Sequence, residues 1–133
     1  MINTAITFGQ SLDKDNFKLT KTTLSPECTY NTGKEILKGP DDICHSYESN
    51  MLDGRKKFDK LEWGQSRVEQ ISGSDFLVHF TDYLTHKGIE HTYRCSQKLT
   101  LDADGKIVYI EHLEDLAERA NLDEFYRQVG LKT

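Results

Sequence analysis

The clearest pattern of hydrophobic and polar positions lies between Phe76 and Leu113. In the first part of this run, Phe76, Val78 and Phe80 alternate with polar residues, which is the period-two pattern of a strand with one buried face. A second segment repeats this alternation, and its apolar parity contains Tyr93, Cys95, Leu99 and Leu101. The pattern therefore predicts two neighbouring strands that share one core-facing side.

The dipeptide Lys87-Gly88 between these two strands predicts a two-residue hairpin turn, in which glycine supplies a positive φ. With this turn, Asp82 faces Tyr93 and Phe80 faces Cys95 across the hairpin, so the two apolar faces agree. A third strand from 106 to 113 follows a turn around 102–105. An even-length register would place Val108, Ile110 and His112 on the same side as the other apolar residues, although Ile107 and Tyr109 are apolar too.

The rest of the chain predicts helices around this sheet. We expect a helix over 3–12, a second short helix capped by Asp13, a short strand starting at Cys28, and a helix from Pro40 to near Gly54. In the segment 58–72, Leu61, Trp63 and Ile71 lie on one parity and Val68 on the other, and a bulge near Gly64 would reconcile them. A final helical segment spans 113–130, with a break expected at Asn121.

This order predicts a single α+β domain over residues 1–133, with helices on one face of a curved antiparallel sheet and a C-terminal helix. The formal net charge of −5 argues against a nucleic-acid-binding surface. No segment approaches the ~20 apolar residues of a membrane span, and the start of the chain does not read as a signal peptide. The three cysteines are too few and too scattered for a disulfide framework, so we expect a soluble, cytoplasmic protein without membrane partners.

Four phrases carry a resemblance to a known family: LSPECTY, ILKGPDDI, GSDFLVHF and LDADGKIVYIEHLED. In this order, the chain from about Thr4 to Leu116 resembles the nuclear transport factor 2-like superfamily, and its SnoaL-like polyketide cyclase branch most of all. The resemblance implies a cone-shaped sheet wrapped on N-terminal helices (a cystatin-like fold), a pocket between helices and sheet, and a homodimer formed through the outer sheet face. Family members include dehydratases, isomerases, epoxide hydrolases, cyclases and proteins without enzymatic activity.

The resemblance also implies where acid and base groups would lie. Asp82 matches the carboxylate that epoxide hydrolase and cyclase members carry on the middle strand, whereas His112 stands at a last-strand position that is usually an acid. Phe80 occupies the position two residues before the acid, where an arginine is common. These departures argue against epoxide hydrolysis and leave the general class open.

Asp82 and His112 are the candidate catalytic residues. A carboxyl whose pKa is raised by an apolar cavity and a near-neutral imidazole can transfer a proton in opposite directions at neutral pH. The alternative is structural: Asp82 would accept a hydrogen bond from the Tyr93 hydroxyl, and His112 would donate to a helix carbonyl.

Aromatic and polar residues are the candidate lining of a pocket for a small apolar or ring-bearing molecule, and they are Tyr93, Gln97, Tyr30, Tyr47, Trp63 and Phe80. Plain core packing is the alternative for Tyr47 and Trp63. On the opposite sheet face, the residues that fit a dimer interface are Tyr83, Arg94, Lys98 and Tyr109.

The segment from Thr100 to Glu111 matches several positions of an EF-hand loop. Because its flanks alternate with period two, a tight turn at DADG explains the same residues. The remaining histidines have no ligand spacing, and the chain has no phosphate-binding glycine loop, so we expect no metal and no cofactor. Two functions follow: a cofactor-free lyase, isomerase or cyclase, or a non-catalytic dimer that binds a ligand or a protein.

Overall fold

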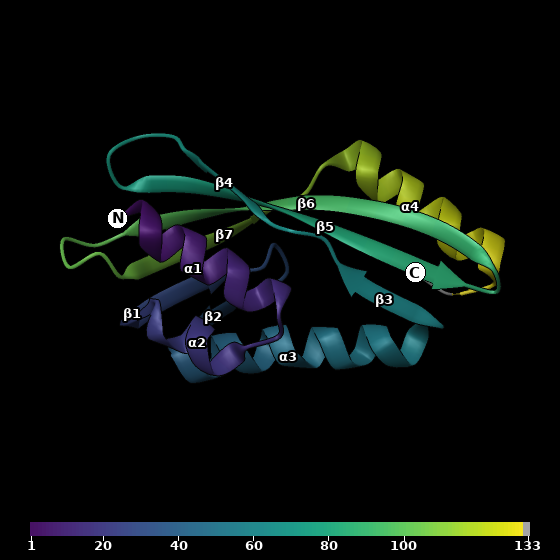
Figure 1. The fold of residues 1–133 in the computed structure, drawn as a ribbon, viewed down its shortest axis with the longest axis horizontal. Helices are drawn as coiled ribbons and strands as arrows, with labels where there is room; N and C mark the ends of the chain where they lie inside the picture. Colours follow the sequence, from purple (N-terminus) through teal and green to yellow (C-terminus); the bar gives the residue numbers. More distant parts are fainter. Residues whose placement is uncertain (132–133) are drawn as a thin grey trace.

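The computed structural model describes residues 1–131 and consists of four helices and seven strands in that range. The elements follow in the order α1 (Ile2–Asp13), α2 (Phe17–Thr22), β1 (Leu24–Asn31), β2 (Ile36–Lys38), α3 (Pro40–Lys57), β3 (Lys60–Trp63), β4 (Arg67–Gln70), β5 (Asp75–His86), β6 (Ile89–Leu101), β7 (Ile107–Leu113) and α4 (Leu116–Val129). The chain is therefore α+β, as its sequence predicts. Figure 1 shows α1, α2 and α3 gathered on one side of the long strands β5 and β6, with α4 at the end where these two strands meet.

The sheet has the strand order β2-β1-β7-β6-β5-β3, and β4 also pairs with β5. The predicted antiparallel sheet needs one correction, because β1 runs parallel to β7. Local hairpin patterns could not predict this pair, since parallel neighbours are joined by long crossover connections instead of turns. The strand predicted to start at Cys28 begins earlier, at Leu24, so that Pro26 lies inside β1 in the stretch where the pairing with β7 shifts register.

The β5–β6 hairpin has the predicted register, with Asp82 opposite Tyr93 and Phe80 opposite Cys95. Both turn residues have positive φ, 50° at Lys87 and 77° at Gly88, as a primed two-residue turn requires. The loop before β7 is also a turn, in which the Asp102 side chain accepts hydrogen bonds from the backbone N–H groups of Asp104 and Lys106.

The prediction for β7 is wrong at Val108. Thr100 pairs with Tyr109 and Leu101 with Ile107, so Val108 is an extra residue in a bulge. Because the bulge changes the parity, Ile107 and Ile110 are both fully buried while Val108 is only half-buried.

Three helix predictions are also corrected. Asn16, not Asp13, caps α2 by accepting from the backbone N–H of Leu19. Helix α3 continues beyond Gly54 to Lys57, because a glycine inside a helix weakens it without ending it. Helix α4 runs through Asn121 without a break and ends at Gly130, which has the left-handed conformation of a C-terminal cap.

The core divides into two clusters along the sheet. In the first, Phe8 of α1 and Ile43 of α3 are fully buried against the inner face of β5 and β6. The second cluster lies near the β5–β6 turn, where α4 packs against Phe58, Leu61 and Leu84. A cavity opens between the two clusters.

The segment between β3 and β4 contains the expected irregularity at Gly64. Trp63 pairs with Asp82 and Arg67 with His79, so the three residues 64–66 lie opposite the two residues 80–81. The Gly64 N–H donates to the Thr81 carbonyl oxygen at 2.8 Å. This interruption reverses the parity, so Leu61 is buried and Ile71 is exposed although both are odd-numbered.

We expect Gly64→Ala to destabilise the protein by about 1–3 kcal/mol, because the added Cβ would lie 3.0 Å from Tyr83 Cε2 and 3.2 Å from Thr81 Cβ. Gly73→Ala is the matched control, because no atom lies within 4 Å of its added Cβ. Urea unfolding of both variants measures the difference. Equal midpoints would contradict the close approach at Gly64.

Candidate functional site

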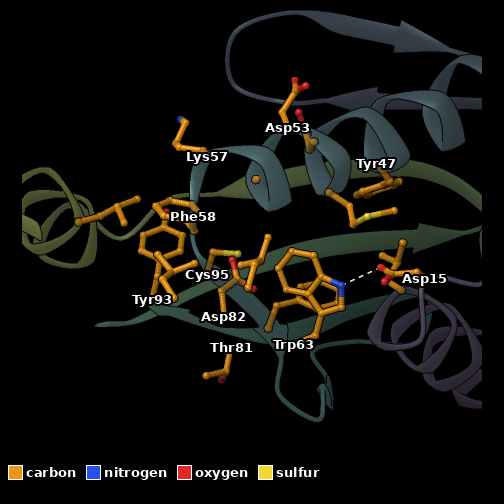
Figure 2. Close-up of a pocket in the computed structure, with 18 of the residues that line it drawn as sticks. Asp15, Tyr47, Asp53, Lys57, Phe58, Trp63, Thr81, Asp82, Tyr93 and Cys95 are labelled. Carbon is orange, nitrogen blue, oxygen red and sulfur yellow. Dashed lines mark hydrogen bonds between the residues drawn. The ribbon is translucent and has the colours of Figure 1, made fainter. Parts of the chain in front are cut away.

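A cavity of about 520 Å³ lies between α3, the inner face of β3, β5 and β6, and α4. Six of the sequence-predicted site residues line it: Tyr47, Trp63, Phe80, Asp82, Tyr93 and Gln97. Figure 2 shows Asp82 and Cys95 close together on the sheet wall, with the Trp63 indole beside them and Tyr47 on the helix side. The predicted residues Tyr30 and His112 are not part of this lining.

Asp82 reaches the cavity because of the strand alternation described above. Its cross-strand neighbours are Trp63 on β3 and Tyr93 on β6. Within residues 1–131 no group donates a hydrogen bond to its carboxyl, and burial alone raises its pKa from 3.8 to about 7. The alternative in which Tyr93 donates to Asp82 therefore has no support in the geometry.

The side chains around Asp82 do not supply a second group that ionises at neutral pH. Burial raises the pKa of Tyr93 and of Cys95 to about 12 in each case, and the Asp82 charge adds to this effect at both residues. Asp82 is thus the group in its immediate surroundings that changes charge at neutral pH.

A chain of neutral hydrogen bonds closes one end of the cavity. The Tyr47 hydroxyl donates to Gln97 Oε1 at 2.6 Å, and Gln97 Nε2 donates to the Tyr30 hydroxyl at 2.9 Å. The rings of Tyr30 and Tyr47 stack with centroids 5.2 Å apart. Burial raises the pKa of Tyr30 to about 12 and that of Tyr47 well above its ordinary value, so both hydroxyls keep their protons. Tyr30 therefore does not line the cavity itself but accepts a hydrogen bond from Gln97, which does.

His112 lies next to Gln97 across the β6–β7 pair and shares its side of the sheet. Its Nδ1 is buried and has no hydrogen-bond partner within the described residues, so donation from this atom to a helix carbonyl is not seen. Burial lowers its pKa, so the imidazole is neutral at pH 7. The structure therefore places Asp82 and His112 on one face of the sheet without bringing them into one cavity.

Several cavity residues were missed by the sequence patterns. The end of α1 contributes Asp13, the loop that follows contributes Asp15, and α4 contributes Arg119, Leu122 and Tyr126. The one available signal was the acid-rich turn DKDN after the first helix. Asp13 accepts hydrogen bonds from the Ser66 N–H and Oγ, both at 2.8 Å, so it ties this loop to the interruption between β3 and β4.

The Asp15 carboxylate binds residues of two other elements. It accepts a hydrogen bond from Trp63 Nε1 at 2.7 Å, which Figure 2 marks with a dashed line, and it pairs with Arg55 at 2.8 Å. The Arg55 guanidinium also lies 5.9 Å from the centre of the Trp63 ring. These contacts hold the indole in the cavity wall.

Within residues 1–131, no group of three or more His, Cys, Asp or Glu side chains could hold a metal ion. No helix in this part of the chain is both long and apolar enough to cross a membrane.

No family model matches the sequence, and no curated protein matches it significantly. Solved structures do match the fold. TerC, crystallised with polyporic acid, aligns with a TM-score of 0.70 and 16% identity over 92% of this chain and 97% of its own. The chain has the nuclear transport factor 2-like fold.

Two further structures share this nuclear transport factor 2-like fold. A candidate SnoaL-like polyketide cyclase from Shewanella denitrificans aligns with a TM-score of 0.68 and 9% identity, over 92% of this chain and 96% of its own. An epoxide hydrolase of the LEH-like type from M. tuberculosis aligns with a TM-score of 0.61 and 16% identity, over 95% of both chains. The TM-scores show that the fold is shared. Because the identities are this low, the chemistry must be argued from the residues of this chain.

We expect Asp82→Asn to stabilise the protein at high pH. The raised folded-state pKa means that Asp82 favours the folded state fully below the unfolded pKa of 3.8 and loses this contribution as pH rises through about 7. At pH 8 the wild-type carboxylate is charged in a largely apolar wall, so the variant should gain up to about 4 kcal/mol relative to its difference from wild type at pH 3.

Urea unfolding of both proteins between pH 3 and 8 measures this gain. The Asp53→Asn variant is the matched control, since Asp53 is another acid of the cavity lining. A stability difference between Asp82→Asn and wild type that does not change with pH would contradict the raised pKa.

Proposed function

We propose that this protein is a cofactor-free enzyme that binds a small apolar or ring-bearing molecule in the cavity and uses Asp82 as its acid/base group. The reaction class is isomerisation, elimination or cyclisation. The observation that carries the proposal is the Asp82 carboxyl, which stands in an aromatic wall without a hydrogen-bond partner in the described residues. A half-buried carboxyl without a partner costs stability when it is charged, so a role with the ligand accounts for its presence.

A pKa of about 7 suits this role, because Asp82 is then present in both its charged and its neutral form at neutral pH. The carboxylate can remove a proton from a carbon next to a carbonyl group, and the resulting carboxylic acid can return the proton to another atom of the same molecule. Each turnover leaves Asp82 in its starting state, so the cycle requires no redox partner.

The lining supports an aromatic or other ring-bearing ligand. Trp63, Phe80 and Tyr93 provide flat apolar surfaces around Asp82, while Gln97 and Tyr47 offer neutral hydrogen-bonding groups at the closed end. Such a wall suits a hydrophobic ring that carries a few oxygen atoms. The complex of TerC with polyporic acid supports the same ligand class, since that protein shares the fold.

The alternative is a non-catalytic module that binds a ligand or a protein as a homodimer. A second hollow, on the outer face of the sheet, favours it: Leu77, Arg94 and Leu113 are among its lining residues. Tyr83 lies on the same face and is 48% exposed. We propose this outer face, including Lys98 and Tyr109, as the homodimer interface.

All three cysteines are free, which supports the expected cytoplasmic location.

A screen of hydroxyquinones and related ring compounds, with polyporic acid as the first probe, tests the two functions. We expect binding to raise the melting temperature of both wild type and Asp82→Asn, and turnover of a bound compound to fall at least about 100-fold in Asp82→Asn. Turnover that is equal in the two proteins would exclude Asp82 as the acid/base group. Stabilisation without turnover of any compound would favour the binding module.

The predicted role of His112 as a second acid/base group is tested separately by His112→Gln. If His112 transfers protons, the variant should lose turnover as strongly as Asp82→Asn does. Because His112 lies outside the cavity lining, next to Gln97 in the sheet, we expect the variant to retain most of its turnover. Its melting temperature gives the control for folding.

A further inference from the structure

The indole of Trp63 forms one wall of the cavity beside Asp82, and it is bound by Asp15, a residue distant in the sequence. Trp63 and Asp82 are direct cross-strand neighbours, so their Cβ atoms lie roughly 5 Å apart. The indole packs on the second core cluster and is only partly buried, so part of it faces the cavity. Its Nε1 donates a hydrogen bond of 2.7 Å to the carboxylate of Asp15, a residue of the loop between α1 and α2.

We propose that Asp15 is a positioning residue: by accepting the indole N–H and pairing with Arg55, it fixes Trp63 against Asp82 and shields one side of that carboxyl from water. The relevance of this arrangement to turnover rests on the proposed function. The arrangement itself can be tested on the protein without any ligand.

The backbone conformation of Asp15 also indicates that this loop is held in place by its contacts. Its φ of 55° lies in the left-handed region, which is unfavourable for most side chains and tolerable for Asp, Asn and Gly. A residue is held in this region when its surroundings determine its position. Here the surroundings are the Trp63 hydrogen bond, the Arg55 ion pair and the Asp13 contacts with Ser66, which together fasten the loop to β3, α3 and the β3–β4 interruption.

The ion pair with Arg55 also keeps the Asp15 carboxylate in position to accept the hydrogen bond from Trp63 Nε1. The Asp15 side chain is 22% exposed and that of Arg55 is 42% exposed, so the pair is partly shielded from water. The Arg55 guanidinium lies 5.9 Å from the ring centre of Trp63 and therefore contacts the indole as well as the carboxylate. The three groups form one unit that spans β3, α3 and the loop.

Charges from every element around the cavity must be considered, because they too can shift the Asp82 pKa. The titratable and charged groups that line the cavity with Asp82 are Asp13 at the end of α1, Asp15 of the loop, Tyr47, Asp53 and Lys57 of α3, Tyr93 and Cys95 of β6, and Arg119 and Tyr126 of α4. Burial is nevertheless what raises the pKa of Asp82. Exclusion of water by neighbours such as Trp63 is thus the effect to test.

Trp63 is the only tryptophan of the chain, so intrinsic fluorescence reports on this indole alone. In Asp15→Gly, which keeps a residue suited to φ 55°, we expect Trp63 emission to become at least about twofold more sensitive to acrylamide. The Asp82 pKa, followed by carboxyl ¹³C NMR, should fall by about one unit or more as water reaches the carboxyl. Asp15→Asn keeps an acceptor oxygen and tolerates the same backbone, so it should restore most of both properties.

A double-mutant cycle separates positioning from charge. In a Trp63→Phe background, Asp15→Gly should leave the Asp82 pKa unchanged if Asp15 acts through the indole. A shift of equal size in both backgrounds would show that Asp15 acts only through its charge and would overturn the proposal. An Asp82 pKa that does not move in Asp15→Gly would overturn it as well. If the pKa moves as expected while no ligand is turned over, the positioning role stands and the proposed enzyme function fails.

Discussion

The alternation of side chains along the β5–β6 hairpin is the constraint on which the rest of the structure depends. The turn at Lys87 and Gly88 sets the pairing of the residues from Asp75 to Thr100, and a slip by one residue would put the apolar side chains of β5 on the opposite face from those of β6. Phe76 and Val78 would then face solvent, and Asp82 would leave the cavity. The apolar core and the acid of the site are therefore fixed by the same register.

The same hairpin also explains why the inner face is solid at one end and hollow at the other. Where Phe76, Val78 and Leu99 face inward, α1 and the first half of α3 supply Phe8 and Ile43 to fill the space. Farther along the hairpin, α1 has ended and α4 covers the sheet only near the turn. The side chains between these regions border on empty space, and Asp82 lies on this stretch. The large buried core compensates the cost of leaving a carboxyl in an apolar wall.

Sequence patterns predicted those features that depend on local periodicity. The hairpin register, the inward side of Asp82 and the turn at Asp102 follow from alternation and turn chemistry within a few residues. The features that were missed join distant segments: the parallel pairing of β1 with β7 and the contact of Asp15 with Trp63. At β7 even local alternation failed, since the bulge at Val108 reverses the parity. His112 lies on the predicted side of the sheet, but it is one strand too far from the cavity, because Gln97 of β6 lines the cavity and His112 of β7 lies beside it. Alternation along a strand does not show how far across the sheet a cavity extends.

The chemistry that this cavity favours follows from how its acids are engaged. Asp13 is bound by Ser66 and Asp15 by Trp63 and Arg55, so neither is free to exchange protons with a ligand. Asp82 carries no such contacts within the described residues. Hydrolysis with one group to activate water and another to protonate the leaving group requires two acid/base groups, whereas the relocation of a proton within one molecule requires one. Asp53, the fourth acid of the lining, is exposed on α3. A single half-buried carboxyl in the aromatic wall therefore favours isomerisation, elimination or cyclisation over hydrolysis.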